Sequence, residues 1–168
     1  MTDMVTLIAK TNPLERDLKT ASRTVLETDI PRLGELYFTA YDAGLAGESI
    51  EVALADIQAS MAGKYGRFLP EASHVALDDQ GKIVAAVLVV ERAIGEDTPD
   101  APFIIELITD RGHRRQGLAE DLVLATLDTL FNEGQSDVAL RVEATNSAAL
   151  ALYLSLDFHR WSPEETDD

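Results

Sequence analysis

Apolar residues recur along the chain at two different spacings, and each spacing predicts a different kind of element. A spacing of three and four residues predicts helices at residues 31–42, 48–61 and 115–132, and a shorter helix is expected at 146–155. Short alternating or continuous apolar runs predict strands at residues 4–9, 21–27, 73–77, 83–91, 103–109, 137–143 and 158–161. This mixture of strands and helices indicates an α/β fold.

Two groups of neighbouring elements have predictable connections. Residues 73–77 and 83–91 flank a tight turn that ends at Gly81, so these two strands are expected to form a hairpin. The run from 83 to 90 is apolar at every position, which predicts a strand that is buried on both faces. Strand, helix and strand across residues 103–143 predict a βαβ unit with parallel strands.

Length and composition predict one domain, residues 1–168, and exclude several kinds of site. The chain has no Cys, so it has no disulfide framework, no thiolate metal site and no cysteine nucleophile. The spacing of its three His suits no metal site. The N-terminus does not read as a signal peptide, and no apolar run is long enough to span a bilayer. We therefore expect a cytoplasmic protein without a membrane partner. Residues 162–168 are rich in acidic residues and are expected to form a tail.

The charge balance makes one short basic stretch stand out. Thirty Asp and Glu against fourteen Lys and Arg give a net charge of −16, which argues against nucleic acid as the main partner and is compatible with a cationic acceptor. Arg111, His113, Arg114 and Arg115 nevertheless lie together between an apolar strand and a helix. The unpaired N–H groups and the macrodipole at a helix N-terminus favour a bound phosphate there.

Two motifs in this region and downstream resemble those of one enzyme family. Residues 114–119 read Arg-Arg-Gln-Gly-Leu-Ala, which is similar to the Arg/Gln-x-x-Gly-x-Gly/Ala signature of the GCN5-related N-acetyltransferase (GNAT) superfamily. Asn146, followed seven residues later by Tyr153, resembles the family's later motif. The resemblance covers residues 20–161, so residues 1–19 are expected to be an N-terminal extension. It implies a mixed, mostly antiparallel sheet with helices on both faces.

The chain departs from the family pattern at two positions, and neither implies a loss of function. Asp157 stands where the family usually has Gly before the last Phe, and Asp tolerates left-handed backbone better than most residues. Ala119 replaces the commoner second Gly, which the signature allows.

The resemblance also implies acetyl-coenzyme A as the donor substrate. Its pyrophosphate is expected on the backbone N–H groups of the signature, where Gly117 permits close approach because it has no Cβ. The residues expected at the pyrophosphate are Arg114, Arg115, Gln116, Gly117, Leu118 and Ala119. The pantetheine arm is expected beside a splayed strand end at Leu107, Ile108 and Thr109.

Catalytic roles follow from the same resemblance. A backbone N–H near Thr109 would polarise the thioester carbonyl, and Tyr153 would protonate the leaving thiolate as general acid. Asn146 would cap its helix and contact the cofactor. Tyr153 also fits a plain core role on an apolar helix face, and Gly117 also fits an ordinary strand-to-helix turn.

Several residues are candidates for the general base that deprotonates the amine. Glu106 lies inside the signature strand and is the candidate catalytic carboxylate. Family members that use a Glu on this strand tend to place it at the other parity, so Glu106 is expected to face away from the acceptor. Glu143, His74 and Glu91 are further candidates, and ordered water alone often suffices in the family.

The expected reaction is direct transfer of acetyl to a primary amine, carried by a small molecule or a peptide. The helices at 31–42 and 48–61, with the loop at 93–101 and its Glu96, Asp97 and Asp100, are expected to shape the acceptor pocket and to favour a cation. A homodimer is also expected from the family.

One alternative is a non-catalytic acyl-coenzyme A sensor or interaction module on the same fold. A nucleotide phosphate-binding domain is disfavoured because the chain lacks the Lys-Ser/Thr pair of a P-loop.

Overall fold

The structure is a computed structural model that describes residues 3–40, 47–95 and 97–163. In this part of the chain the strands are β1 (Met4–Lys10), β2 (Ser22–Thr24), β3 (His74–Leu77), β4 (Ile83–Val90), β5 (Phe103–Thr109), β6 (Asp137–Glu143) and β7 (His159–Trp161). The helices are α1 (Ile30–Ala40), α2 (Ile50–Met61), α3 (Leu118–Asn132) and α4 (Ser147–Ser155). Short 3₁₀ turns occupy Glu27–Asp29, Pro70–Ala72 and Arg111–His113.

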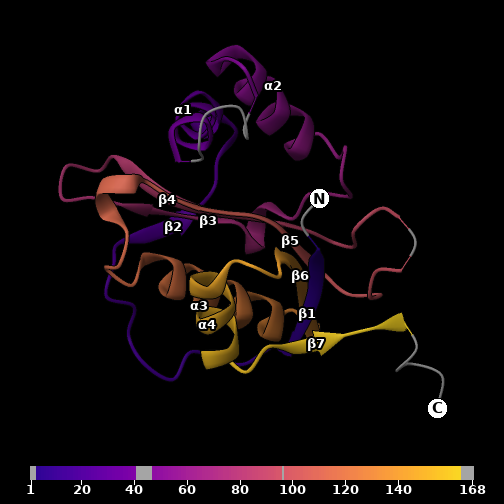
Figure 1. Cartoon of the computed structure of the whole chain (residues 1–168). Coiled ribbons are helices and arrows are strands. Elements are labelled where there is room, and N and C mark those ends of the chain that lie inside the picture. The colour runs from indigo at the N-terminus through magenta and orange to yellow at the C-terminus, as the bar shows by residue number, and fades with distance from the viewer. Residues whose placement is uncertain (1–2, 41–46, 96, 164–168) are drawn as a thin grey trace.

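The strands form one mixed sheet in the order β2-β3-β4-β5-β6-β1-β7, which confirms the predicted fold class. Every neighbouring pair is antiparallel except β5 and β6, which are parallel. Helices α1 and α2 cover one face of the sheet, and α3 and α4 cover the other (Figure 1). Each face has its own hydrophobic core, so the sheet is the middle layer of three.

Strand β4 shows why an apolar run without alternation is stable here. All eight of its residues are buried. Ala86 and Leu88 belong to the core under α1 and α2, whereas Val87 and Val89 belong to the core under α3 and α4. Because helices cover both faces, neither side of the strand needs polar residues, as predicted.

The βαβ unit of β5, α3 and β6 forms as predicted, but its two strands separate almost at once. Their parallel pairing is limited to Phe103–Ala139 and Ile104–Leu140. Beyond these positions β5 stays paired with β4 up to Thr109, and β6 stays paired with β1 up to Glu143. The facing edges of β5 and β6 therefore diverge while each strand keeps a partner on its other side.

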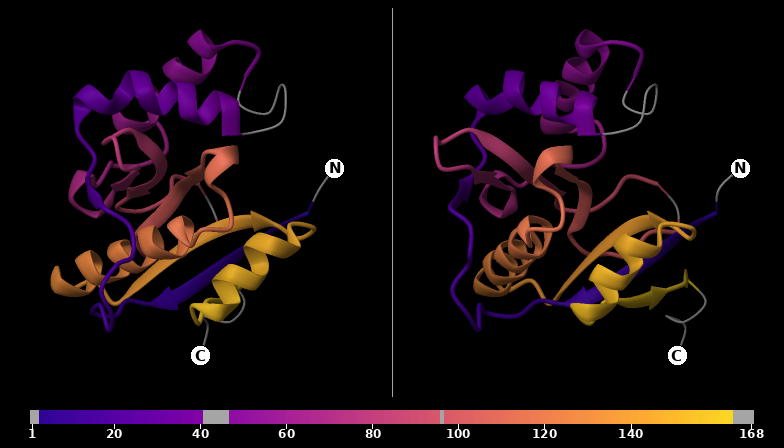
Figure 2. Two further views of the ribbon diagram at one scale, coloured as in Figure 1. Left: turned by 90° about the vertical axis from the view of Figure 1, so that its left-hand side faces the viewer. Right: turned by 60° about the vertical axis from the view of Figure 1, so that its left-hand side comes forward.

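The segment expected as an N-terminal extension, residues 1–19, contributes strand β1 to the sheet. This strand lies between β6 and β7, with Leu7 opposite Leu140 and Ile8 opposite His159 (Figure 2). Leu7 and Ala9 alternate into the core under α3 and α4, where 3% and 1% of their surface is exposed. The short alternation at 4–9 that predicted a strand therefore also supplies core residues.

The segment after β1 is fastened across α3 by a buried carboxylate. The side chain of Asp121 is 2% exposed and accepts hydrogen bonds from the backbone N–H of Lys19 (2.8 Å) and of Thr20 (3.0 Å). Arg16 Nη2 lies 3.0 Å from the same carboxylate and 2.7 Å from Glu120. A single side chain of α3 thus holds residues 16–20 against the helix.

Element boundaries differ from the predictions in a few places. The predicted strand at 21–27 is shorter, because the carboxylate of Asp29 accepts the N–H of Leu26 and turns the chain into a 3₁₀ turn. Helix α1 is described up to Ala40, and the predicted residues 41 and 42 lie outside the described ranges, as do 164–168 of the predicted acidic tail. Across the described ranges, the helices are too short or too polar to cross a membrane.

We predict that Asp121→Asn lowers the free energy of unfolding by about 2 kcal/mol, because an amide cannot accept all of the hydrogen bonds that converge on this buried carboxylate. A urea titration measures the change, because its midpoint and slope together give the free energy of unfolding. The control is Glu120→Gln, which removes a partly exposed carboxylate from the same Arg16 and should shift the midpoint much less. Equal midpoints for the two variants would contradict the role of Asp121.

Candidate active site

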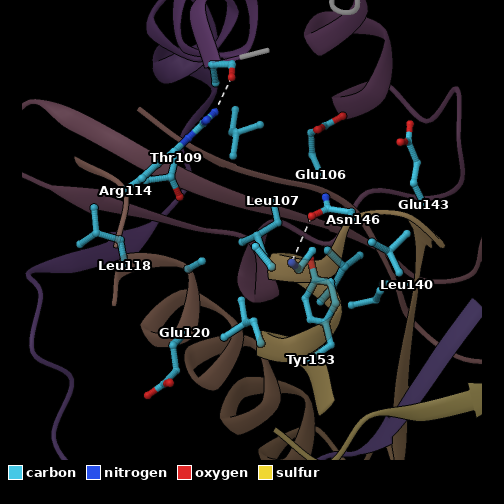
Figure 3. Close-up of a pocket in the computed structure, with 18 of the residues that line it drawn as sticks. Glu106, Leu107, Thr109, Arg114, Leu118, Glu120, Leu140, Glu143, Asn146 and Tyr153 are labelled. Carbon is cyan, nitrogen blue, oxygen red and sulfur yellow. Dashed lines mark hydrogen bonds between the residues drawn. The ribbon is translucent and has the colours of Figure 1, made fainter. Parts of the chain in front are cut away.

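A cavity of about 800 Å³ lies where β5 and β6 diverge. Its walls come from β5, the turn that follows it, the start of α3, the end of β6 and helix α4 (Figure 3). These elements are the ones that carry the predicted site residues. The cavity is lined by Glu106, Leu107, Ile108, Thr109, Arg114, Arg115, Gly117, Leu118, Ala119, Asn146 and Tyr153 among others. Gln116 lies between two lining residues and is exposed.

The turn after β5 is organised by Asp110, a residue that the sequence motifs did not identify. Its carboxylate accepts the N–H of Gly112 at 3.2 Å and lies 2.8 Å from Nδ1 of His113. The contact with His113, and then the bond from Gly112, lower the pKa of Asp110 below its usual range. An Asp placed two residues before a Gly at a strand end is a local signal for such a turn.

The backbone between this turn and α3 is shaped to receive an anion. Arg115 and Gly117 both have left-handed φ values, 65° and 82°. A Cβ built on Gly117 would meet no protein atom within 4 Å, so the requirement for Gly comes from φ and from the space in front of the backbone. Gly117 is also the N-cap of α3, which places the first N–H groups of the helix at the cavity.

The two acidic residues in the first turn of α3 are partly compensated by one arginine. Glu120 and Asp121 both pair with Arg16, and Asp121 also accepts two backbone N–H groups. The hydrogen bonds to Glu120 and then Asp121 raise the pKa of Arg16. The macrodipole and the free N–H groups therefore act against a reduced negative charge.

Arg111 and Arg114 extend from the turn to the end of α1. Arg111 Nε donates to the carbonyl oxygen of Thr39 at 3.0 Å, and Arg114 Nη2 donates to that of Ala40 (Figure 3). Arg111 is exposed, but its side chain, like that of Arg114, donates a hydrogen bond to a carbonyl group in the last described turn of α1. The side chains of the basic stretch are thus divided between the cavity and a neighbouring helix.

The two residues of the downstream motif lie together on α4. Asn146 Oδ1 accepts the N–H of Ala149 at 3.1 Å, which confirms the predicted cap. Tyr153 is 8% exposed and packs on Phe158 with ring centroids 5.6 Å apart. Its ring rises from α4 toward β5 (Figure 3). Asp157 has φ 67°, so it adopts the left-handed backbone that Gly usually provides in the family.

The surroundings of Tyr153 keep its phenol protonated. Burial, and then the charge of Glu106, raise its pKa to about 12. A neutral phenol in the cavity wall is a proton donor at physiological pH. Tyr153 therefore has both the core packing expected of a buried Tyr and the protonation state that a general acid needs.

Glu106 faces α1 and α2. The β4–β5 register shifts between Leu88 and Val89, so Glu106 pairs with Leu88 and Ile104 pairs with Val89. This β-bulge leaves Ile105 as the extra residue, and Glu106 shares the face of Leu88, which packs under α1 and α2. Figure 3 shows its carboxylate pointing toward that side. The parity expectation concerned the acceptor, whose position stays a prediction.

Glu106 also acts electrostatically on helix α1. The pKa of Tyr37 is raised, first by burial and then by the charge of Glu106. A hydrogen bond from Tyr65 to Asp56 (2.7 Å) extends this polar region along α2. The carboxylate of Glu106 therefore lies within electrostatic reach of Tyr153 on one face of the sheet and Tyr37 on the other.

The other candidate bases divide into one at the cavity and two elsewhere. Glu143 is exposed and lines the cavity. His74 packs against α3, with Nε2 3.3 Å from Thr129 Oγ1, and burial lowers its pKa. Glu91 pairs with Arg67 on the surface. Among the residues that the structure describes, no three His, Cys, Asp or Glu side chains are placed to hold a metal ion.

The acidic loop expected to shape an acceptor pocket contributes little to this cavity. Glu96 lies outside the described residues. Asp100 lies 3.5 Å from Arg92 on the surface, and neither Asp97 nor Asp100 is among the described residues that line the cavity. Helix α1 reaches the cavity through Ala40.

Comparisons of the sequence identify acetyltransferases. Residues 35–158 match the Acetyltransferase (GNAT) family. N-alpha-acetyltransferase 30 of Schizosaccharomyces pombe is 34% identical over 92 residues, which cover 55% of this chain and 60% of that protein. The [ribosomal protein bS18]-alanine N-acetyltransferase of Escherichia coli is 36% identical over 67 residues, 40% of this chain and 45% of that protein. The matches thus span less than two thirds of these curated relatives.

Solved structures share the fold. A GCN5-related N-acetyltransferase from Sphaerobacter thermophilus has a TM-score of 0.71 and 21% identity, and the match covers 96% of this chain and 49% of that chain. The ribosomal-protein-S18-alanine N-acetyltransferase from Escherichia coli has a TM-score of 0.61 and 24% identity, covering 83% of this chain and 77% of that chain. With the family match across residues 35–158, the chain belongs to the GNAT acetyltransferase family.

Proposed function

We propose that the chain is an N-acetyltransferase that transfers acetyl directly from acetyl-coenzyme A to a primary amine. The observation that carries the proposal is the cavity between β5 and β6, which joins an anion-binding helix N-terminus to the buried phenol of Tyr153. One end of this cavity suits a pyrophosphate and the other suits a thioester. Membership of the GNAT family supports the same reaction.

The residues at the diverging strands fit the donor substrate. The backbone N–H groups of residues 114–119 would hold the pyrophosphate, and the side chain of Arg115 would add charge. Beyond Ile104, β5 has no ladder partner on the β6 side, so Leu107, Ile108 and Thr109 offer backbone groups to the amide-rich pantetheine arm. Exposed Asn146 lines the same cavity and would contact the donor.

The reaction needs three groups at the open end of β5. The amine nitrogen attacks the thioester carbonyl, and a backbone N–H near Thr109 would stabilise the developing oxyanion. As the C–S bond breaks, the thiolate would take the phenolic proton of Tyr153. Burial raises the pKa of Tyr153 to about 12, so the phenol is neutral throughout the neutral range.

Glu106 is the base that the geometry favours. It is half-buried, lines the cavity and faces the helices on which the acceptor pocket was expected. Its carboxylate, acting directly or through water, would accept a proton from the alkylammonium before attack. Glu143 lines the same cavity at the end of β6 but is exposed.

The acceptor is proposed to be the amine of a peptide N-terminus. The names of two relatives support this acceptor, because one specifies N-alpha-acetylation and the other specifies N-acetylation of a ribosomal-protein alanine. An acidic chain and a carboxylate at the acceptor face would attract such a cation. A small-molecule amine is the alternative acceptor, and a homodimer in the cytoplasm stays a prediction.

We predict that Gly117→Glu abolishes the rise in melting temperature that acetyl-coenzyme A produces in the unmodified chain. Ligand at one hundred times its dissociation constant adds about 2.7 kcal/mol of stability, and a carboxylate in the phosphate cradle would prevent this binding. Gly134→Glu is a matched control, since Gly134 also has φ 82° and open space around its Cβ but lies at the other end of α3. Its melting temperature should still rise with ligand. An equal response of both variants would place the donor site elsewhere.

We predict that Tyr153→Phe binds coenzyme A as tightly as the unmodified chain but releases it about 100-fold more slowly during turnover, because the thiolate loses its proton donor. Calorimetry with coenzyme A measures binding, and thiol release with a panel of peptides and small amines measures turnover. Unchanged turnover in Tyr153→Phe would leave only the packing role of this side chain. Coenzyme A binding without turnover by any amine would support the sensor alternative.

We predict that Glu106→Gln lowers kcat/KM for the amine at least tenfold near pH 7, and that the loss shrinks as pH rises and the free amine forms without help. A pH profile from 6 to 10 measures the effect. Glu143→Gln, on the same cavity, is the control and should change the profile much less. Identical profiles for Glu106→Gln and the unmodified chain would assign the deprotonation to water alone.

A further inference from the structure

The end of helix α1 is fastened by side chains from the donor-binding turn. The last turn of α1 contains no basic residue of its own. The carbonyl groups of Thr39 and Ala40 accept hydrogen bonds from the donor-binding turn. Arg111 Nε donates to Thr39 O at 3.0 Å, and Arg114 Nη2 donates to Ala40 O across 74 residues of sequence. Two guanidinium groups therefore bring hydrogen bonds and positive charge to the last described turn of α1, where positive charge is favourable.

Helix α1 also carries groups that reach the proposed acceptor side. Tyr37 lies on α1 one turn before Ala40, and the charge of Glu106 acts on its phenol. Ala40 lines the cavity itself. At its other end, α1 is attached to β4 by Arg32 Nε, which donates to Ile83 O at 3.0 Å. The position of the last turn of α1 therefore sets the distance between Tyr37 and Glu106.

The third arginine of the stretch is placed differently. Arg115 has left-handed backbone and lines the cavity. Across residues 3–40, 47–95 and 97–163, no hydrogen bond or ion pair involves its side chain. Arg111 and Arg114 would have to leave the carbonyl groups of α1 to reach a phosphate, whereas Arg115 would not. The three side chains are therefore suited to two different tasks.

We propose that Arg111 and Arg114 are positioning residues that hold helix α1, and with it the acceptor side of the site, against the donor-binding turn. Arg115 contributes the cationic side chain at the pyrophosphate. The donor and acceptor roles in this inference rest on the proposed function. The contact between the turn and α1 does not depend on turnover. The side chain of Arg114, the first Arg of the signature, is thus assigned to helix α1, and only the backbone N–H of this residue is left for the pyrophosphate.

Binding and hydrogen exchange separate the two tasks. In Arg114→Met and Arg111→Met, the dissociation constant of coenzyme A, measured by calorimetry, should stay within about twofold of the unmodified chain. Amide exchange at residues 37–40, measured by mass spectrometry, should become about tenfold faster. In the matched control Arg115→Met, exchange at residues 37–40 should stay unchanged while the dissociation constant rises about three- to tenfold. Arg114→Lys should restore part of the protection, since an ammonium group can still donate to a carbonyl at a helix end.

Kinetics gives a readout that a general loss of stability would not produce. With a peptide that has a free N-terminal amine, Arg114→Met should raise KM for the peptide about threefold or more and leave KM for acetyl-coenzyme A unchanged. A rise in the coenzyme A dissociation constant above fivefold in Arg114→Met, with unchanged exchange at residues 37–40, would overturn the proposal and make Arg114 a phosphate ligand. If coenzyme A binds none of the proteins, the proposed function fails, while the exchange result still decides whether these arginines hold α1.

Discussion

The divergence of β5 and β6 is the constraint on which the site depends. Two strands can separate inside a sheet only if each keeps its hydrogen bonds on the other edge, because unpaired buried backbone groups are costly. Strand β4 supports β5 up to Thr109, and β1 supports β6 up to Glu143. Without β1, the end of β6 would lack a partner on both sides. The N-terminal strand is thus remote in sequence from the signature motifs but necessary for the cavity between them.

The proposed anion-binding end of the cavity lies in a chain with a net charge of −16. It relies on backbone geometry more than on excess positive charge. Left-handed residues at 115 and 117 precede α3, and its first N–H groups face the cavity. The nearby carboxylates of Glu120 and Asp121 are occupied by Arg16 and by backbone donors from the segment after β1. The same segment that fastens the N-terminal strand therefore also limits repulsion at the phosphate site.

Much of the fold could be predicted from the sequence because the signals are local. The apolar run of β4, the hairpin turn at Gly81 and the cap at Asn146 each depend on neighbouring residues. The position of β1 could not be predicted, since alternation at 4–9 identifies a strand but not its neighbours. The partners of Arg111 and Arg114 lie more than 70 residues away and are main-chain atoms, which leave no mark in the sequence.

The face of the sheet on which Glu106 lies depends on a β-bulge that the sequence pattern does not reveal. A single extra residue in β5 lies between Ile104 and Glu106, and Glu106 is on the face of α1 and α2. From there its charge raises the pKa of both Tyr37 and Tyr153, but in each case burial is the larger cause. Neutralising Glu106 would therefore leave Tyr153 protonated at neutral pH. The proposed base and the proposed acid are close enough to interact, so the separate contributions of the carboxylate and the phenol follow only from the two single variants compared with the double variant.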